Sequence, residues 1–299
     1  MQALSKKIKL IYKSKNAYLF ILPSFLFFAV FTLYPVLKGV QLSFLRYNVR
    51  PKPSYWVGFS NYIEMFQDPI FLTAVKNTLI YTIFVVLGSC VLALGVALMI
   101  FPLSNKLQSF YKSLYYLPGV TSAVIIASQW KWIFHPVYGL LNSFMETFGL
   151  EPIPWLGLKQ TALPSIIFMD IAKGDGAAIL LIMAALNSIP NTIFEAAICD
   201  GASKIRILKK ITLPLLKPIM LYLIVMSTIS SLQVFVPVFM LTRGGPEFAT
   251  VTVAYEIYKS AFMRMMRFDL AAAQGVILFL ATMITSIIYF KLLKDDVSY

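Results

Sequence analysis

Residues 75–101 read VKNTLIYTIFVVLGSCVLALGVALMIF, and this stretch decides which kind of fold to expect. The hydrocarbon core of a bilayer is about 30 Å thick, and a helix needs about 20 apolar residues to cross it. Within that core an α-helix satisfies all of its backbone hydrogen-bonding groups from its own segment. The stretch therefore predicts a transmembrane helix.

The composition extends this interpretation to the whole chain. Its 299 residues are 59% apolar and only 13% charged, with a mean hydropathy of +0.77, whereas about a quarter of the residues in soluble domains are charged. Apolar stretches of spanning length lie at about 18–41, 75–101, 112–134, 163–187, 218–241 and 270–291. They predict an all-α membrane protein with six transmembrane helices. Asp170, Lys173 and Asp175 interrupt the fourth stretch, so five helices with one re-entrant segment is the alternative.

The N-terminal segment is interpreted as a basic tail followed by a membrane anchor. Five lysines precede the first apolar stretch: Lys6, Lys7, Lys9, Lys13 and Lys15. That stretch is longer than the core of a cleaved signal, and the sequence from Leu37 to Leu45 lacks a small-residue cleavage site. We therefore expect residues 1–16 to form a basic cytoplasmic tail and residues 17–299 to form a single transmembrane domain.

The distribution of lysine and arginine predicts the orientation, because both concentrate in cytoplasmic loops. With the N-terminus inside, the inner segments hold fourteen of them: Lys6, Lys7, Lys9, Lys13, Lys15, Lys106, Lys112, Lys204, Arg206, Lys209, Lys210, Lys217, Lys291 and Lys294. The outer segments hold eight: Arg46, Arg50, Lys52, Lys159, Arg243, Lys259, Arg264 and Arg267. The bias predicts a multi-pass protein with both termini in the cytoplasm. Topology and attraction to anionic membrane lipid account for the net charge of +13, so no nucleic-acid partner is expected.

No pattern typical of an enzyme occurs in the sequence. A phosphate-binding loop of the form G-x-x-x-x-G-K-S/T is absent, and the single histidine, His135, does not complete a catalytic set with a nucleophile. Cys90 lies inside the second apolar stretch and Cys199 in a cytoplasmic loop, so neither a disulfide nor a metal site is expected. The chain is therefore expected to hold no cofactor and not to hydrolyse ATP itself.

The loop between the fourth and fifth stretches, residues 188–217, carries the most specific pattern. It reads EAAICDG from Glu195 to Gly201, and after nine more residues ITLP from Ile211 to Pro214. Ala196 and Ala197 present almost no side chain, which lets a helix approach the groove of another protein closely, and Asp200 with Gly201 supplies a turn. Pro214 is expected to end the second helix before the next transmembrane helix begins. The pattern predicts two short cytoplasmic helices joined by a hinge.

Taken together, Glu-Ala-Ala at 195–197, Gly201, Ile211 and Leu213-Pro214 resemble the cytoplasmic signature loop of permease subunits in bacterial ATP-binding-cassette importers. Other segments resemble the carbohydrate-uptake branch of that family: residues 188–218, residues 57–62, Asn77-Thr78 and residues 241–246. The large extracellular insertion and the extra N-terminal helices of maltose-type permeases are absent from the sequence. The chain therefore resembles the minimal six-helix form.

The resemblance implies a set of partners and a coupling surface. It implies that the loop forms coupling helices that dock on a cytoplasmic ATPase, through Glu195, Ala196, Ala197, Asp200, Gly201, Ile211, Leu213 and Pro214. The implied partners are a second permease subunit in a heterodimer, two ATPase subunits that bind ATP and magnesium, and an extracellular or periplasmic solute-binding protein. Such an assembly lies in the bacterial cytoplasmic membrane and imports a sugar or oligosaccharide by alternating access.

Polar residues in the fourth and fifth stretches are candidates for the solute path. Asp170 and Lys173, at positions i and i+3, either pair with each other or face a solute. Serine hydroxyls on one face of the fifth stretch suit either a sugar or a neighbouring helix. The resemblance places Asp170, Lys173, Gly174, Ala177, Ser227, Ser230 and Ser231 where the sugar-lining residues of maltose-type permeases lie, and Gln233 is a further candidate.

Three alternatives stay open at this point. Lys173 favours an acidic sugar, whereas Asp170 and Asp175 disfavour one, so neutral and acidic glycans are not separated. Glycerol phosphate or another small polar solute is the nearest rival to a sugar. An ion-coupled secondary transporter would use the charges of the fourth stretch but would leave the pattern from Glu195 to Pro214 unexplained.

Overall fold

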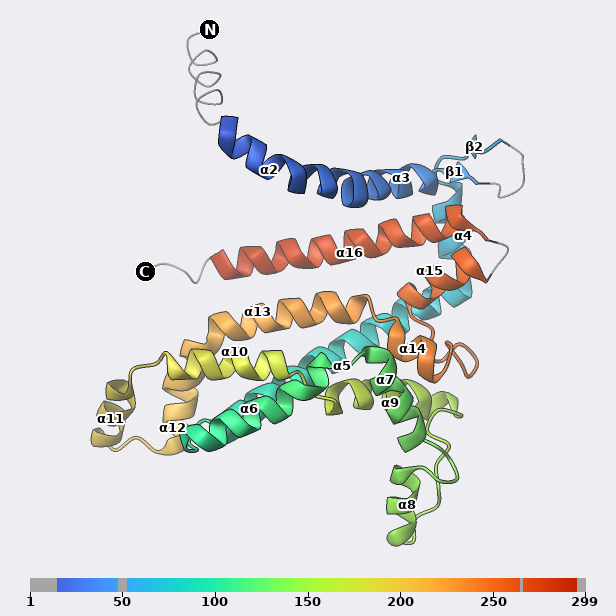
Figure 1. The fold of residues 1–299 in the computed structure, drawn as a ribbon. Coiled ribbons are helices and arrows are strands. Elements are labelled where there is room, and N and C mark those ends of the chain that lie inside the picture. Colours follow the sequence, from blue (N-terminus) through green and yellow to red (C-terminus); the bar gives the residue numbers. More distant parts are fainter. Residues whose placement is uncertain (1–14, 48–52, 264–265, 295–299) are drawn as a thin grey trace. The chain divides into compact units, whose positions relative to one another are not determined.

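The computed structural model describes residues 15–47, 53–263 and 266–294, and these residues are predominantly helical (Figure 1). The described chain forms two compact units. The first unit contains the residues up to Met65 together with Ser260–Val276, and the second contains Phe66–Lys259 together with the residues from Ile277 onward. Residues 1–14 of the predicted basic tail lie outside the described residues, so that tail stays a prediction.

The first unit opens with a long apolar helix. α2 (Lys15–Phe28), the π-helical turn η1 (Ala29–Leu33) and α3 (Tyr34–Ser43) follow one another without a break. The Tyr34 N–H donates to the carbonyl of Ala29, five residues back, directly before Pro35. Because proline has no N–H to donate, this wider turn allows the helix to continue past it.

A short ribbon and a helix complete the start of the first unit. β1 (Leu45–Arg46) pairs antiparallel with β2 (Tyr55–Trp56), and α4 (Ser60–Gln67) follows. The buried side-chain amide of Asn61 donates to the carbonyls of Ser43 and Leu45 at 2.8 and 2.9 Å. Asn61 thus ties α4 to the end of α3, which gives the segment 57–62 a structural role.

Four charged side chains join this region to the start of α16 (Phe268–Lys294), a helix that continues into the second unit. The Arg267 guanidinium donates to both carboxylate oxygens of Glu64, at 2.9 and 3.1 Å, and to Asp269 at 3.0 Å. Arg46 contacts Glu64 at 3.1 Å and Asp269 at 3.6 Å. The Asp269 side chain is fully buried, and the two guanidinium groups balance its charge.

The second unit consists of helices of very different lengths. In chain order they are α5 (Pro69–Ile100), α6 (Asn105–Val120), α7 (Ala123–Ile133), α8 (Leu140–Thr147), α9 (Lys159–Ala172), α10 (Gly176–Asn187), α11 (Asn191–Cys199), α12 (Lys204–Ile207), the π-helical turn η2 (Leu208–Thr212), α13 (Leu213–Leu232), α14 (Val236–Leu241) and α15 (Val253–Phe262), whose last residues belong to the first unit.

The core of the second unit lies where α5, α10 and α13 meet. It contains small residues of α5, Ala93 and Ala97, against Ile182 and Leu186 of α10 and Leu216 of α13, all of them buried. Small residues allow helix backbones to approach closely, which is how helices pack in a membrane. This packing fixes the relative positions of the three helices that also form the site described below.

Among the described residues, four helices are long and apolar enough to cross a membrane: Leu19–Ser43, Pro69–Ile100, Lys204–Leu232 and Phe268–Tyr289. These correspond to the first, second, fifth and sixth apolar stretches of the sequence. α10 and α11, bent by 65°, add a fifth if the pair is counted as one span. The third stretch, 112–134, and the fourth, 163–187, are each divided between two helices.

The expectation that Pro214 ends a helix is wrong. The chain is helical from Lys204 to Leu232, and Pro214 lies at the start of α13. The Leu213 N–H donates to the carbonyl of Leu208, five residues back, so the turn before the proline is again π-helical. The wider turn accommodates a proline, which has no N–H to donate, as it does before Pro35. The short helix α12 therefore runs directly into the long helix α13.

Candidate functional site

A cavity of about 480 Å³ opens in the second unit between α5, α6, α13 and the junction of α9 with α10. It brings together seven of the eight residues predicted for the solute path, namely Asp170, Lys173, Gly174, Ala177, Ser227, Ser230 and Ser231. Gln233, the eighth, does not line it and instead forms the exposed C-terminal cap of α13. Two segments that are about 50 residues apart in sequence thus meet at one site.

The break between α9 and α10 forms one wall of the cavity. Gly174 has φ of +72°, a conformation that favours glycine, and it turns the chain out of α9. Asp175 then caps α10, since its carboxylate accepts the N–H of Ala178 at 3.0 Å. A helix interrupted in this way exposes backbone groups to a cavity inside a membrane protein, which is tolerated where the cavity is polar.

Gly176 allows the start of α10 to lie directly against α6. A Cβ atom at this position would lie 2.4 Å from the Tyr115 carbonyl oxygen and 2.6 Å from the Tyr116 Cα. Only glycine therefore fits at this contact, and the close approach sets the width of the cavity between the two helices.

The charged residues of the cavity are paired. The Lys173 ammonium forms an ion pair with the Asp170 carboxylate, and the Tyr81 hydroxyl of α5 donates a hydrogen bond to the other oxygen of that carboxylate. The Asp170 side chain is 12% exposed and that of Lys173 is 37% exposed. The sequence left open whether Asp170 and Lys173 pair with each other or face a solute. The structure shows the pairing, and Lys173 also lines the cavity.

The fifth predicted stretch supplies hydroxyl groups to the opposite wall. Ser227, Ser230 and Ser231 of α13 line the cavity together with Ser89 of α5. No side-chain hydrogen bond from the three α13 serines to another described residue is present, so their hydroxyls are available to a solute. Hydroxyl groups that both donate and accept are suited to a sugar.

Three polar side chains that line the cavity, those of Ser89, Tyr116 and Asp175, were not among the predicted site residues. Tyr81, which bonds to Asp170 behind the cavity wall, was not predicted either. Tyr81 is separated from Asp170 by 89 residues. A phenolic hydroxyl in an apolar stretch signals a buried partner, because it needs a hydrogen bond there. The sequence does not indicate which partner that is.

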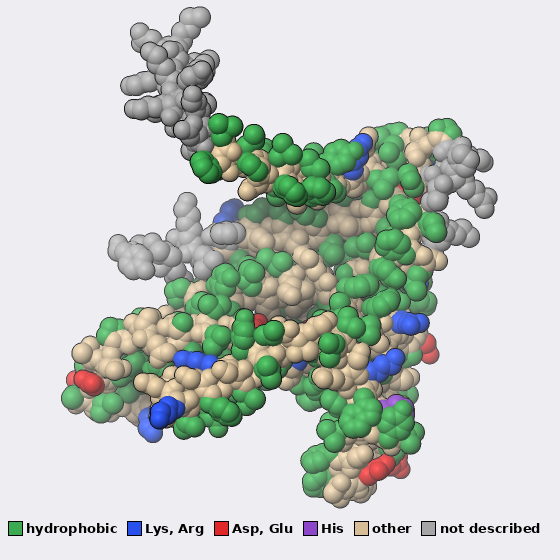
Figure 2. Space-filling model, viewed as in Figure 1, with side chains coloured by type: hydrophobic (Ala, Val, Ile, Leu, Met, Phe, Trp, Pro, Cys, Tyr) green, Lys and Arg blue, Asp and Glu red, His purple; other side chains and the backbone are tan. Residues whose placement is uncertain are grey.

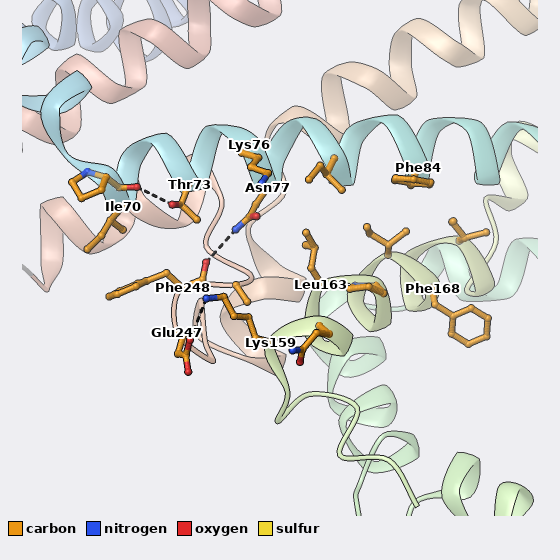
Figure 3. Close-up of a pocket in the computed structure, with 17 residues that line it drawn as sticks. Ile70, Thr73, Lys76, Asn77, Phe84, Lys159, Leu163, Phe168, Glu247 and Phe248 are labelled. Atoms are coloured by element: carbon orange, nitrogen blue, oxygen red, sulfur yellow. Dashed lines mark hydrogen bonds and ion pairs between the residues drawn. The ribbon is translucent and has the colours of Figure 1, made fainter. Parts of the chain in front are cut away.

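A second, larger cavity of about 930 Å³ lies between α5, α9 and the segment after α14 (Figure 3). Its walls are mainly apolar, with Ile80, Phe84 and Leu163 among them, and none of the predicted site residues lines it. The Lys159 ammonium and the Glu247 carboxylate pair at 3.2 Å at its edge. An apolar cavity of this kind offers a sugar few hydrogen bonds, so the smaller cavity is the candidate solute site.

Two segments that resemble those of carbohydrate permeases, Asn77-Thr78 and residues 241–246, lie near the edge of the larger cavity. The Asn77 amide donates to the carbonyls of Phe248 and Val251 at 3.1 and 3.0 Å, and the Thr78 hydroxyl accepts the N–H of Val253 at 3.0 Å. Asn77 and Thr78 thereby fix to α5 the loop that follows residues 241–246. Their role is to position this loop.

The predicted coupling segment consists of α11, a turn and α12 at one end of the second unit (Figure 1). Gly201 has φ of +72°, and the Ala202 N–H donates to the Ala197 carbonyl at 2.9 Å, which closes the end of α11. The Ser203 hydroxyl then caps α12 by accepting the Arg206 N–H at 3.4 Å.

The side chains of this segment differ in their exposure. Glu195, Ala196 and Asp200 are exposed, whereas Ala197 is buried inside the chain and Ile211 is half-buried. Leu213 and Pro214 lie on the continuous helix from Lys204 to Leu232, which is long and apolar enough to cross a membrane. Ile198 and Ile205 add exposed apolar surface, at 64% and 66%, which the motif did not include. The segment therefore offers a partner an apolar surface with an acidic residue, Glu195, within it.

Comparison with known proteins gives relatives along nearly the whole chain. No family model matches it. The chain is 31% identical over 283 residues to the probable ABC transporter permease protein YurN of Bacillus subtilis, which covers 93% of this chain and 95% of that protein. It is 33% identical over 279 residues to the sulfoquinovosyl glycerol transport system permease protein SmoG of Agrobacterium fabrum, with coverage of 93% and 90%.

A solved structure shows the same fold. A bacterial ABC transporter involved in the import of the acidic polysaccharide alginate contains a chain that superposes with a TM-score of 0.85 at 25% sequence identity. The match covers 98% of this chain and all of that one. The two chains thus share one fold over their full length.

Proposed function

Because this chain belongs to the permease subunits of ATP-binding-cassette transporters, we propose that it carries a sugar or oligosaccharide into the bacterial cell. It is a transport subunit and not an enzyme, as the similarity to permease proteins shows. The observation that carries the proposed substrate class is the serine-lined cavity, in which residues of α9, α10 and α13 come together. The named substrates of two similar proteins, sulfoquinovosyl glycerol and alginate, support it.

The proposed transmembrane domain, which encloses the solute path, has six transmembrane segments. Four are the apolar helices described above, and the third and fourth are α6 with α7 and α9 with α10. The support for counting α9 with α10 as one span is that the break between them lies in the cavity wall, where an interrupted helix is tolerated. The re-entrant alternative for the fourth stretch is not needed on this count.

The proposed coupling surface is formed by α11, the turn at Gly201 and α12. Two features support it: the exposed surface around Glu195 and the continuous helix from Lys204 to Leu232, which links this surface to the serines of the cavity. A rigid helix transmits a displacement at one end to the other. Docking on an ATPase at α11 and α12 would therefore move the cavity wall, as alternating access requires.

The proposed assembly contains a second permease subunit, two ATPase subunits and a solute-binding protein. The ATPase subunits bind ATP and magnesium, since no phosphate-binding loop occurs in this sequence. A structure of the alginate transporter in complex with its periplasmic protein, which superposes on this chain with a TM-score of 0.82 at 26% identity, supports the last partner. Lys204, Arg206, Lys209 and Lys210 beside α11 support a cytoplasmic location for the coupling segment and for both termini.

Purification of the tagged full-length chain from its own membranes tests this assembly. We expect an ATP-binding-cassette ATPase and a second permease chain to accompany it, with ATP hydrolysis that rises when the solute-binding protein and its sugar are added. A chain that purifies alone and transports solute without an ATPase would overturn the proposal.

A further inference from the structure

α8 projects from the second unit and carries an exposed apolar stripe. Leu140, Phe144 and the C-terminal cap Phe148 follow one another at a spacing of four residues, and these residues are 58%, 63% and 66% exposed. Glu146 lies on the other side of the helix. The short helix is therefore amphipathic, and its apolar side is not covered by the described chain.

A buried asparagine holds this helix in place. The Asn142 amide donates to the carbonyls of Pro136 and Ile153, both at 2.9 Å. Its carbonyl oxygen accepts the Ile153 N–H at 3.1 Å and the Trp155 indole N–H at 2.8 Å. With all its hydrogen-bonding capacity used on both sides of α8, Asn142 clamps the segment, so the apolar stripe is a fixed feature of the surface.

The direction of α8 suits a helix that lies parallel to a membrane surface. In Figure 1, α8 runs crosswise to α13, which belongs to a candidate span, and lies away from the end of the second unit that carries α11. Hydrophobic side chains cover much of this projection in Figure 2. Trp132 and Tyr138, at 54% and 59% exposure, lie just before the helix in the chain, and such residues gather at the boundary between membrane and water.

The charge of the segment indicates what kind of lipid contact it makes. Residues 136–158 contain Glu146 and Glu151 but no lysine or arginine. An interfacial helix without basic residues gains its affinity from apolar burial and not from attraction to anionic headgroups. The segment thus has no reason to prefer anionic lipid.

We propose that α8 is an in-plane interfacial helix, with Leu140, Phe144 and Phe148 inserted among the acyl chains of the leaflet opposite the coupling helices. The phospholipid ligand is bound through its acyl chains, whatever its headgroup. α8 anchors the segment that leads into α9, the helix that carries Asp170. It thereby holds the N-terminal end of α9 at the level of the membrane surface.

Nitroxide labels on single cysteines test this position. The background carries Cys90→Ala and Cys199→Ser, and the labelled variants are Phe144→Cys and Phe148→Cys, with Glu146→Cys as the matched control on the polar side. The full-length chain, with the subunits that accompany it, is placed in phosphatidylcholine nanodiscs. We expect collisions with oxygen to exceed collisions with a water-soluble nickel chelate several-fold at positions 144 and 148, and the reverse at position 146.

Two results would overturn the proposal. Equal access of the nickel chelate at all three positions would show a helix in water, and protection of positions 144 and 148 from both reagents would show a protein partner over the stripe. A repeat with added phosphatidylglycerol separates acyl-chain contact from headgroup attraction. An unchanged profile supports the proposal, and a profile that appears only with the anionic lipid contradicts it.

Discussion

The Asp170 carboxylate pairs with the Lys173 ammonium one helical turn away, at the point where α9 ends and the break before α10 begins. The Tyr81 hydroxyl completes the arrangement from α5. The only ammonium that lines the cavity among the described residues is therefore already balanced by a carboxylate.

This pairing predicts the behaviour of Lys173→Met. Uptake of a neutral oligosaccharide and of a uronic-acid oligosaccharide should fall by the same factor, because the change leaves Asp170 as an unbalanced carboxylate, at a cost of about 3 kcal/mol. Adding Asp170→Asn should restore part of the uptake of both. Transport assays of both sugars in the same cells measure this, and a loss confined to the acidic sugar would instead identify Lys173 as a ligand of the solute.

The coupling segment predicts two variants that insert but do not transport. Glu195→Lys reverses the charge on the exposed surface of α11, and Gly201→Val places a β-branched side chain where φ is +72°, at a cost of about 1–2 kcal/mol. Both should abolish uptake while the amount of chain in the membrane stays normal. Gly201→Asn is the control, since asparagine tolerates this conformation, and it should retain most of the uptake. Normal uptake by Glu195→Lys would remove α11 from the coupling surface.

The contact of α10 with α6 predicts different costs for two neighbouring glycines. Gly176→Ala should destabilise the chain by about 1–3 kcal/mol, because its Cβ would overlap the backbone of Tyr115 and Tyr116. Gly174→Asn should cost little, since no atom lies within 4 Å of a Cβ at that position and asparagine accepts a positive φ. Thermal unfolding of the purified variants compares the two, and an equal loss at both positions would contradict the close approach of the helices.

The cluster of Arg46, Glu64, Arg267 and Asp269 predicts a stability that depends on pH. The hydrogen bonds from the Arg267 guanidinium, and then its charge, hold the pKa of Glu64 below its usual value. A depressed pKa means that the folded state favours the ionised carboxylate. The stabilisation that ionised Glu64 gives to the fold is therefore complete above the ordinary pKa of glutamate, and it is lost as the pH falls through the lowered pKa of the folded state. The melting temperature of the wild type should thus exceed that of Glu64→Gln at neutral pH.

The same comparison at acidic pH supplies the control. The difference between wild type and Glu64→Gln should shrink as the pH falls, because Glu64 is then protonated in both the folded and the unfolded state. A difference that does not vary with pH would show that the glutamate acts through packing and not through its charge.

The helical membrane class could be predicted from local patterns in the sequence, and seven of the residues that line the cavity could be predicted from polar interruptions together with the family resemblance. Asp170, Lys173 and Asp175 interrupt an apolar stretch of the sequence, and the structure places the end of α9 there. The division of the third stretch between α6 and α7 was not predicted, because Thr121 and Ser122 hardly lower the hydropathy of the residues around them.

Two further features depend on contacts that a sequence pattern does not reveal. The hydrogen bond of Tyr81 to Asp170 joins residues on different helices, and its partner follows only from how α5 packs on α9. Pro214 was expected to end a helix on its local chemistry, but a π-helical turn before it accommodates the missing N–H. In both cases the surrounding packing, not the residue itself, decides the outcome.

Uptake into proteoliposomes tests the central claim most directly. The purified assembly is reconstituted with ATP inside and with the solute-binding protein and a labelled oligosaccharide outside. We predict uptake that requires hydrolysable ATP, stops with a non-hydrolysable analogue and is unaffected by a protonophore. Uptake that proceeds without ATP and is abolished by the protonophore would contradict the account, because the chain would then be driven by an ion gradient.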